Sequence, residues 1–278
     1  DELLLEAGSR MLHDAYRRDK AGRPTFDRVM RGLTALREHG VDWNALTTVN
    51  AANEEYPAEV YRFLRDVCGC RFIQFIPIVE RPCVDGVPSG TEVTERSVSP
   101  GGWGRFLIAV FEEWVRRDVG SVFVQQFDVA LANWYGEPSG LCVHTATCGG
   151  ALAMEFNGDV YACDHFVEPA YLRGNVHQTH LAELVASGEQ VDFGSAKQTT
   201  LPRYCRECDV RFACHGGCPK DRSALTPDGE PGLNYLCPGY KAFFRHVDAP
   251  LRRMCALLRE GRSPAEIVAD HADGRAPR

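Results

Sequence analysis

Apolar and polar positions along the first half of the chain predict helices and strands in turn. Residues 26–39 place Val29, Leu33 and Leu36 on one helical face, and Gly40 stands where such a helix would end. Further helices are predicted over 54–67, 103–117 and 128–134, and strands over 42–50, 71–78 and 121–126. Regular alternation of strand and helix with short connections is typical of a parallel sheet.

Residues 1–137 are therefore expected to form part of a β/α barrel. A right-handed series of βα units closes into a full or a partial barrel. Only three or four such units are visible in this sequence, which is too few for a whole barrel. A barrel without its first units would show this pattern, and it would expose a sheet edge and apolar helix faces.

The pattern changes near residue 138, after which the alternation of strand and helix is lost. Short apolar runs at 151–156 and 160–163 flank Asn157-Gly158, which is a strong signal for a β-hairpin. The expected fold class is α/β. It comprises a partial barrel over 1–137 and a cysteine-rich domain over 138–278, the latter with a hairpin and with C-terminal helices from about residue 234.

Cysteines cluster in the second half of the chain at spacings typical of metal ligands. One motif reads C-x2-C-x5-C-x3-C-P and comprises Cys205, Cys208, Cys214 and Cys218. Four further cysteines complete the two groups, three before this motif and one after it that also precedes a proline: Cys142, Cys148, Cys163 and Cys237. These eight thiols would serve two [4Fe–4S] clusters with four thiolates each. A single structural zinc site within the motif is the alternative, although it would leave the preceding three cysteines without a fourth partner.

Composition and charge narrow the class of protein. The chain of 278 residues is 44% hydrophobic and 25% charged, which is ordinary for a soluble globular protein. A net charge of −7 argues against a nucleic-acid partner. No apolar run approaches the roughly 18 residues of a membrane span, and no signal-peptide pattern opens the chain. We therefore expect a cytoplasmic protein, in which the clustered cysteines among the 12 bind metal rather than form disulfides.

The cysteine pattern resembles the SPASM domain, the auxiliary-cluster domain of radical S-adenosylmethionine enzymes. Several segments narrow the resemblance to the anaerobic sulfatase-maturating enzymes: LHDAYR, LTTVNAAN, RFIQFIPIVER and CDHFVEP. This resemblance covers nearly the whole chain from about Leu12. It implies an oxidoreductase that converts a Cys or Ser side chain of a sulfatase to Cα-formylglycine.

The resemblance also implies roles for individual residues. Cys142, Cys148, Cys163 and Cys218 would hold a first auxiliary [4Fe–4S] cluster, and Cys205, Cys208, Cys214 and Cys237 a second. Asp164 would be the general base, and Arg17 would contact S-adenosylmethionine. The implied partners are a sulfatase segment of the C/S-x-P-x-R type and a reducing electron donor such as flavodoxin or ferredoxin.

The sequence departs from the family pattern at one point. It contains no C-x3-C-x2-C motif, which in the family binds the cluster that cleaves S-adenosylmethionine. We expect that third cluster only in a longer, full-length protein, because the first barrel units are missing, and we expect this chain alone to be inactive. Two other functions stay open: another SPASM-class enzyme that modifies peptides, and a non-catalytic, cluster-bearing module that binds peptides.

Overall fold

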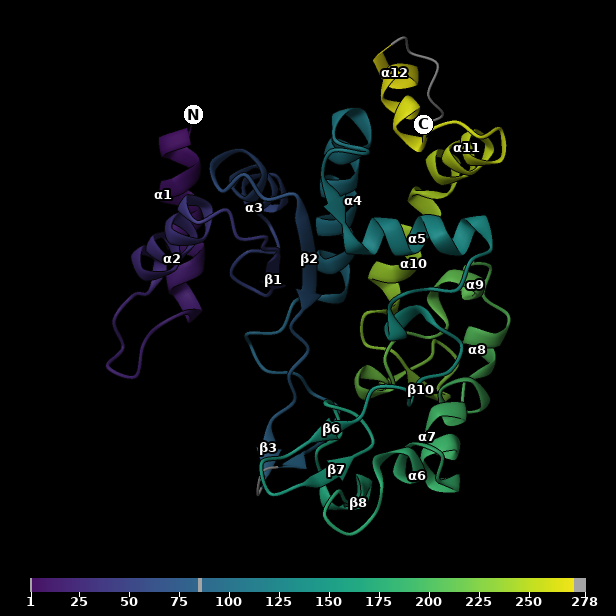
Figure 1. Cartoon of the computed structure of the whole chain (residues 1–278). Coiled ribbons are helices and arrows are strands. Elements are labelled where there is room, and N and C mark those ends of the chain that lie inside the picture. Colours follow the sequence, from purple (N-terminus) through teal and green to yellow (C-terminus); the bar gives the residue numbers. More distant parts are fainter. Residues whose placement is uncertain (1, 85–86, 273–278) are drawn as a thin grey trace. The chain divides into compact units, whose positions relative to one another are not determined.

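The structure, a computed structural model, describes residues 2–84 and 87–272. The chain divides into two compact units (Figure 1). Unit 1 combines Asp1–Glu80, Glu95–Gly136 and Pro238–Arg278, and unit 2 combines Arg81–Thr94 with Glu137–Cys237.

A three-stranded parallel sheet forms the centre of unit 1. Its strands are β1 (Ala45–Val49), β2 (Phe72–Pro77) and β5 (Phe123–Val124), in the order β1-β2-β5. Thr47 pairs with Phe75, and Phe72 pairs with Phe123. Strands β1 and β2 run side by side in Figure 1. The three strands that the sequence pattern predicts are thus present, although each is shorter than its apolar run.

Helices follow each strand of this sheet, as the alternating pattern predicts. The helical elements of the chain before residue 137 are α1 (Glu2–Tyr16), α2 (Phe26–Glu38), α3 (Pro57–Arg62), a π-helix η1 (Phe63–Val67), α4 (Pro100–Arg117) and α5 (Gln125–Tyr135). Helix α4 begins after Ser99, whose Oγ accepts a hydrogen bond from the Gly102 N–H at 3.0 Å. This is an N-cap, which satisfies one of the free N–H groups at the start of the helix.

The core of unit 1 is aromatic and includes helices from the end of the chain. These are α10 (Cys237–His246), α11 (Asp248–Arg259) and α12 (Ile267–Ala272). Phe243 on α10 packs against Phe111 and Phe127, with ring centroids 6.3 and 5.8 Å apart. We expected residues 138–278 to form one domain. Pro238–Arg278 instead groups with unit 1, because the apolar face of α10 completes this core.

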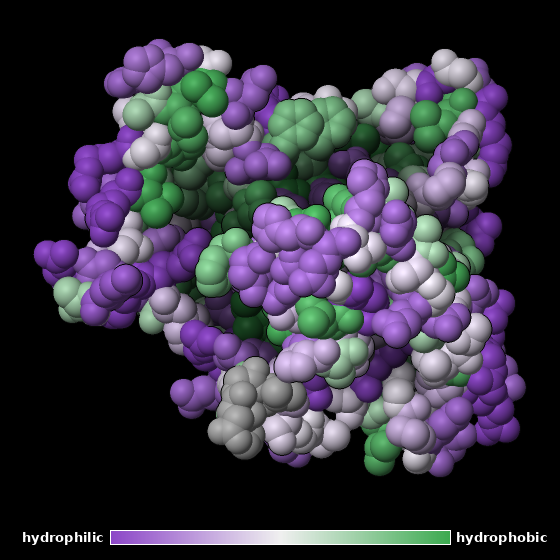
Figure 2. Space-filling model, turned by 60° about the horizontal axis from the view of Figure 1, so that its bottom comes forward, coloured by the Kyte–Doolittle hydropathy of each residue, from purple (hydrophilic) through white to green (hydrophobic). Residues whose placement is uncertain are grey.

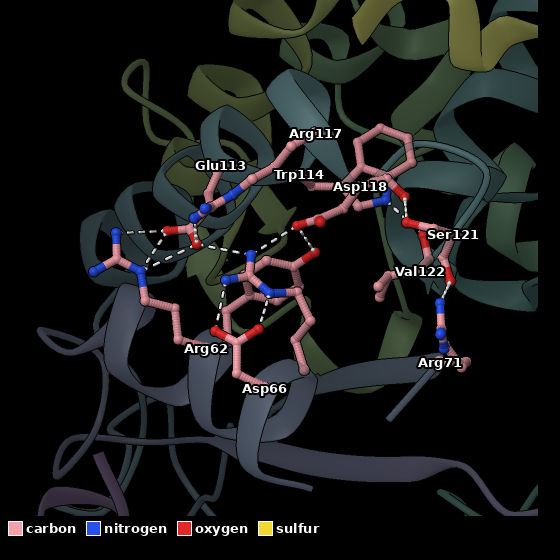
Figure 3. A network of polar contacts seen from close by, with 11 residues as sticks. Arg62, Asp66, Arg71, Glu113, Trp114, Arg117, Asp118, Ser121 and Val122 are labelled. Atoms are coloured by element: carbon pink, nitrogen blue, oxygen red, sulfur yellow. Dashed lines mark hydrogen bonds and ion pairs between the residues drawn. The ribbon is translucent and has the colours of Figure 1, made fainter. Parts of the chain in front are cut away.

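A network of charged side chains joins η1 to α4 (Figure 3). The Arg65 guanidinium donates to Glu113 and to Asp118, each at 2.8 Å, and it is largely buried. The Tyr61 hydroxyl also donates to Asp118, at 2.8 Å. Because both partners of each ion pair are shielded from water, this network fixes the two helices more firmly than exposed pairs would.

Unit 2 contains small antiparallel sheets and short helices. Its central sheet has β6 (Ala153–Met154), β7 (Asp159–Tyr161) and β8 (Leu172–Asn175) in that order. Strands β6 and β7 pair across the turn at Asn157-Gly158. Two two-stranded sheets are formed by β3 (Cys83–Val84) with β4 (Val87–Pro88) and by β9 (Ala224–Leu225) with β10 (Pro231–Leu233).

The described residues of unit 2 also form several short helices. The α-helices are α6 (Leu181–Val185), α7 (Gly188–Thr199), α8 (Arg203–Arg206) and α9 (Arg211–Cys214). Three 3₁₀ turns complete the unit: η2 (Cys142–His144), η3 (Pro169–Tyr171) and η4 (Pro219–Asp221). Helix α7 is not among the elements that the sequence pattern predicts.

Some apolar side chains remain at the surface (green in Figure 2). On the sheet of unit 1, Leu46, Phe72 and Phe123 are 58%, 52% and 40% exposed. These three apolar side chains lie on one strand each of the parallel sheet. In the described ranges, no helix combines the length and the apolar character that crossing a membrane requires.

Candidate metal centre

The cysteine motif of residues 205–218 is folded by two short helices and a left-handed turn. Cys205 lies within α8, and Cys214 is the last residue of α9. The next three residues all have positive φ, namely 48° at His215, 75° at Gly216 and 63° at Gly217. A Cβ at Gly216 would lie 2.4 Å from Cδ2 of Leu201, so only glycine fits there. This turn brings the motif back on itself before Cys218.

One group of thiols surrounds Cys214. The pKa of Cys214 is raised to about 12, first by burial and then by the nearby thiolates of Cys237, Cys205 and Cys208. Like charges act on one another in this way only when they are close. Cys214 and these three neighbours are the residues that the family resemblance assigns to the second cluster.

A second group of thiols is centred on Cys218. Burial raises the pKa of Cys218 to about 11, and the thiolate of Cys142 adds to the increase. Burial likewise raises the pKa of Cys163 to about 12, with a contribution from Cys218, and the pKa of Cys148, with a contribution from Cys142. These four cysteines are the ones assigned to the first cluster.

Helix α7 holds the segments that carry three of these four thiols. Gln190 donates through Nε2 to the carbonyl of Gly149 at 2.8 Å and to that of Ala162 at 3.0 Å. These carbonyls belong to the residues next to Cys148 and Cys163. Lys197 donates to the carbonyls of Cys142 and Val143. These roles could not be predicted from the sequence, since buried Gln and Lys leave no apolar pattern.

Arg222 is a second basic side chain among the cysteines, and it is half-buried. Its guanidinium donates to the carbonyls of Lys197 at 2.7 Å, His215 at 3.1 Å and Gly216 at 3.2 Å. Burial lowers the pKa of Arg222, whereas the thiolates of Cys205 and Cys218 act in the opposite direction. Removing part of a guanidinium from water is unfavourable without an anionic partner, so the surroundings of Arg222 suit a negatively charged group.

The chemistry of the thiols fits iron–sulfur clusters. All the cysteines are free thiols, and each group supplies four of them. The left-handed turn leaves no room for a side chain at Gly216. Within residues 2–84 and 87–272, no three His, Cys, Asp or Glu side chains are arranged to hold one metal ion. Cys68, Cys70 and Cys255 are buried in unit 1 and take no part in either group.

Asp164 lies directly after Cys163 and is exposed. Its Oδ1 accepts a hydrogen bond from the Cys163 thiol at 3.0 Å, and this bond is the main reason that the pKa of Asp164 is lowered. The carboxyl group is therefore ionised at neutral pH and can accept a proton.

Arg17 lies in unit 1, one residue after the end of α1, and is exposed. Its N–H donates to the His13 carbonyl at 3.0 Å, and its own carbonyl accepts from Thr25 Oγ1 at 2.7 Å. These contacts fix the backbone of Arg17. The structure therefore anchors this residue at its main chain and leaves the side chain at the surface.

Comparison with known proteins shows which families the chain resembles. Residues 147–209 match the SPASM family, an iron–sulfur cluster-binding domain. Over 276 residues the chain is 48% identical to the serine-type anaerobic sulfatase-maturating enzyme of Bacteroides thetaiotaomicron, covering 96% of this chain and 66% of that protein. The chain is a homologue of the anaerobic sulfatase-maturating enzymes.

Other sulfatase-maturating enzymes are similar at lower identity. The serine-type enzyme of Klebsiella pneumoniae is 36% identical over 247 residues, which cover 88% of this chain and 58% of that protein. The cysteine-type enzyme of Clostridium perfringens strain 13 is 26% identical over 242 residues, which cover 86% and 63%. The chain thus spans about two thirds or less of the length of these relatives.

Solved structures show the same mixed α/β fold. The structure of native anSMEcpe with bound AdoMet and Cp18Cys peptide matches with a TM-score of 0.76 at 24% identity. The match covers 93% of this chain and 73% of that chain. A second structure of that protein, with AdoMet and Kp18Cys peptide, gives the same TM-score.

Proposed function

We propose that this protein acts in anaerobic sulfatase maturation, oxidising a Cys or Ser side chain of a sulfatase to Cα-formylglycine. The observation that carries this proposal is the 48% identity to a serine-type maturating enzyme over nearly the whole chain. Identity to serine-type relatives exceeds that to cysteine-type relatives, so a Ser substrate is favoured. Because the chain covers only part of those relatives, its activity is proposed for the full-length protein.

Two auxiliary [4Fe–4S] clusters are part of the proposal. Cys142, Cys148, Cys163 and Cys218 would hold the first cluster, and Cys205, Cys208, Cys214 and Cys237 the second. The grouping of neighbouring thiolates supports these sets. When bound, such clusters supply electron transfer. The chain contributes the thiolates, the close left-handed turn, and the buried groups that hold the segments of the first set in place.

Asp164 is proposed as the general base. Its exposed carboxylate next to Cys163 can take the proton from the substrate hydroxyl or thiol as the adjacent carbon is oxidised. Arg17 is proposed to contact S-adenosylmethionine, which is bound in the similar anSMEcpe structures.

The remaining parts of the proposal concern architecture and partners. Residues 1–137 would form the C-terminal part of a radical S-adenosylmethionine barrel, and the SPASM domain would begin near residue 138. A cytoplasmic sulfatase segment of the C/S-x-P-x-R type would be the substrate, in line with the peptides bound to anSMEcpe. A flavodoxin or ferredoxin would supply electrons.

Anaerobic reconstitution tests the cluster part with this chain alone. We expect about eight irons and eight sulfides per chain. About one zinc and no sulfide would contradict it.

The substrate part is tested with S-x-P-x-R and C-x-P-x-R peptides, against a control peptide in which Pro and Arg are replaced by Ala. Binding of the first two alone supports sulfatase maturation. With the full-length protein, mass spectrometry should show oxidation of the Ser or Cys side chain. Equal binding of the control favours another peptide-modifying SPASM enzyme. Binding without turnover favours a non-catalytic module.

A further inference from the structure

Two basic side chains lie among the cysteines in places where a cation is costly. Lys197 on α7 is only 1% exposed, and Arg222 follows η4 in the same unit. Burying a cation is unfavourable unless an anion compensates for the lost hydration. The anions nearest to these two side chains should therefore explain why a Lys and an Arg stand there.

Lys197 faces the first cysteine set. Its ammonium donates to the carbonyls of Cys142 and Val143, the latter at 3.0 Å. The thiols of Cys148, Cys142 and Cys218 lie close enough to this ammonium to place negative charge beside it once they are deprotonated. All three thiolates belong to the set proposed for the first cluster.

Arg222 faces both sets. The thiolates that act on its guanidinium are those of Cys205 and Cys214 from the second set, and Cys218 and Cys148 from the first. Three carbonyls hold this guanidinium in place, and one of them belongs to Lys197. This bond to the backbone carbonyl of Lys197 ties the Arg222 guanidinium to helix α7, the helix from which the Lys197 ammonium reaches the Cys142 segment.

We infer that Lys197 and Arg222 are the fixed counter-charges of the two clusters and set their reduction potentials. Lys197 acts mainly on the first cluster, and Arg222 acts on both. Reduction adds a negative charge to a cluster, and a fixed cation in a water-poor site stabilises that charge. The cations therefore raise the reduction potentials of the clusters and favour uptake of an electron from the substrate as it is oxidised. This inference rests on the proposed clusters.

Neutral variants separate charge from hydrogen bonding. Lys197→Gln and Arg222→Gln each keep a donor for a carbonyl but lose the positive charge. Potentials are measured by redox titration of the reconstituted chain at pH 7, monitored by electron paramagnetic resonance. Cys208→Ser and Cys148→Ser backgrounds, which retain the first and the second cluster respectively, assign each signal.

We expect Lys197→Gln to lower the reduction potential of the first cluster by at least about 59 mV, which for one electron is a tenfold change in the ratio of oxidised to reduced cluster at a given potential. The second cluster should change less than twofold. Arg222→Gln should lower both potentials. Arg211→Gln is the matched control, because Arg211 lies on α9 near the same cysteines but is exposed. It should change neither ratio by more than twofold.

Several outcomes would overturn the inference. One is full iron content with unchanged potentials in both Gln variants. Another is a shift of only one cluster in Arg222→Gln. If a Gln variant loses iron, Lys197→Arg or Arg222→Lys must restore both iron and potential; failure of this rescue would show that the side chains serve shape rather than charge. Absence of iron from the unaltered chain would instead defeat the proposed clusters themselves.

Discussion

Gly104 on α4 and Gly239 on α10 meet backbone to backbone in unit 1. A Cβ at position 104 would lie 2.7 Å from the Gly239 Cα and 2.8 Å from its carbonyl oxygen. Real Cβ atoms do not approach backbone atoms this closely, and a backbone cannot rotate away as a side chain can. Trp103 packs edge-to-face on Tyr240 next to this contact, with ring centroids 6.4 Å apart. We therefore expect Gly104→Ala to destabilise unit 1.

Two opposing contributions set the magnitude. Alanine stabilises a helix interior by about 1 kcal/mol relative to glycine. Overpacking of a core costs about 1–3 kcal/mol, and the upper end applies here because the clash is with backbone. The net loss in free energy of unfolding should be about 2 kcal/mol. For a chain of this size such a loss corresponds to a fall of roughly 4–8 °C in Tm.

Urea unfolding followed by tryptophan fluorescence measures this loss. Gly32→Ala on α2 is the matched control, because nothing lies within 4 Å of a Cβ added there. The control should gain about 0.5–1 kcal/mol. If Gly104→Ala proved as stable as this control, the two helices would be able to separate at little cost, and the argument from close approach would be refuted.

Three further predictions follow from the described contacts. Cys208→Ser and Cys148→Ser should each reduce iron from about eight to about four per chain, as measured by iron analysis, and loss of all iron in either would contradict two separate sets. Asp118→Ala leaves the Tyr61 hydroxyl without its acceptor and removes one of the acceptors of the largely buried Arg65, so it should cost about 3 kcal/mol in urea unfolding, whereas Asp66→Ala, at an exposed partner of Arg65, should cost less than about 1 kcal/mol. Burial raises the pKa of Asp128 to about 7, so the folded chain keeps a proton that the unfolded chain loses near pH 4, and stability falls as the pH rises from about 4 to 7. Asp128→Asn should remove this slope, so its Tm should exceed that of the unaltered chain by more at pH 8 than at pH 5. An equal difference in Tm at the two pH values would count against the raised pKa of Asp128.

Much of unit 1 could be predicted from the sequence because its elements carry strong apolar periods. Strand β2 alternates buried Ile73 and Phe75 with more exposed neighbours, and helix α4 presents a broad apolar face. The same reasoning could not place α10 in unit 1. Whether an apolar helix face completes one core or another is decided by packing, and periodicity does not record it.

Helix α7 shows why unit 2 was harder to predict. Its buried positions are Gln190, Gly194 and Lys197, so its inward face has no apolar period. Gly194 is there because a Cβ would lie 2.2 Å from the Cys148 carbonyl oxygen. Polar and small residues are selected at this helix by its contacts with cysteine-bearing segments. The cysteine spacing pointed to clusters, but the division into sets came from family resemblance and stays a prediction.

The interleaving of the two proposed sets has a consequence for how the protein is made. A ribosome releases Cys142, Cys148 and Cys163 well before Cys205, yet the first set stays incomplete until Cys218 has emerged. The second set, begun inside that interval, waits for Cys237. Neither cluster can therefore be finished before Cys218 has been synthesised, and cluster insertion becomes a late event. A stalled chain ending between Cys218 and Cys237 would carry one complete set of ligands and three thiols of the second set.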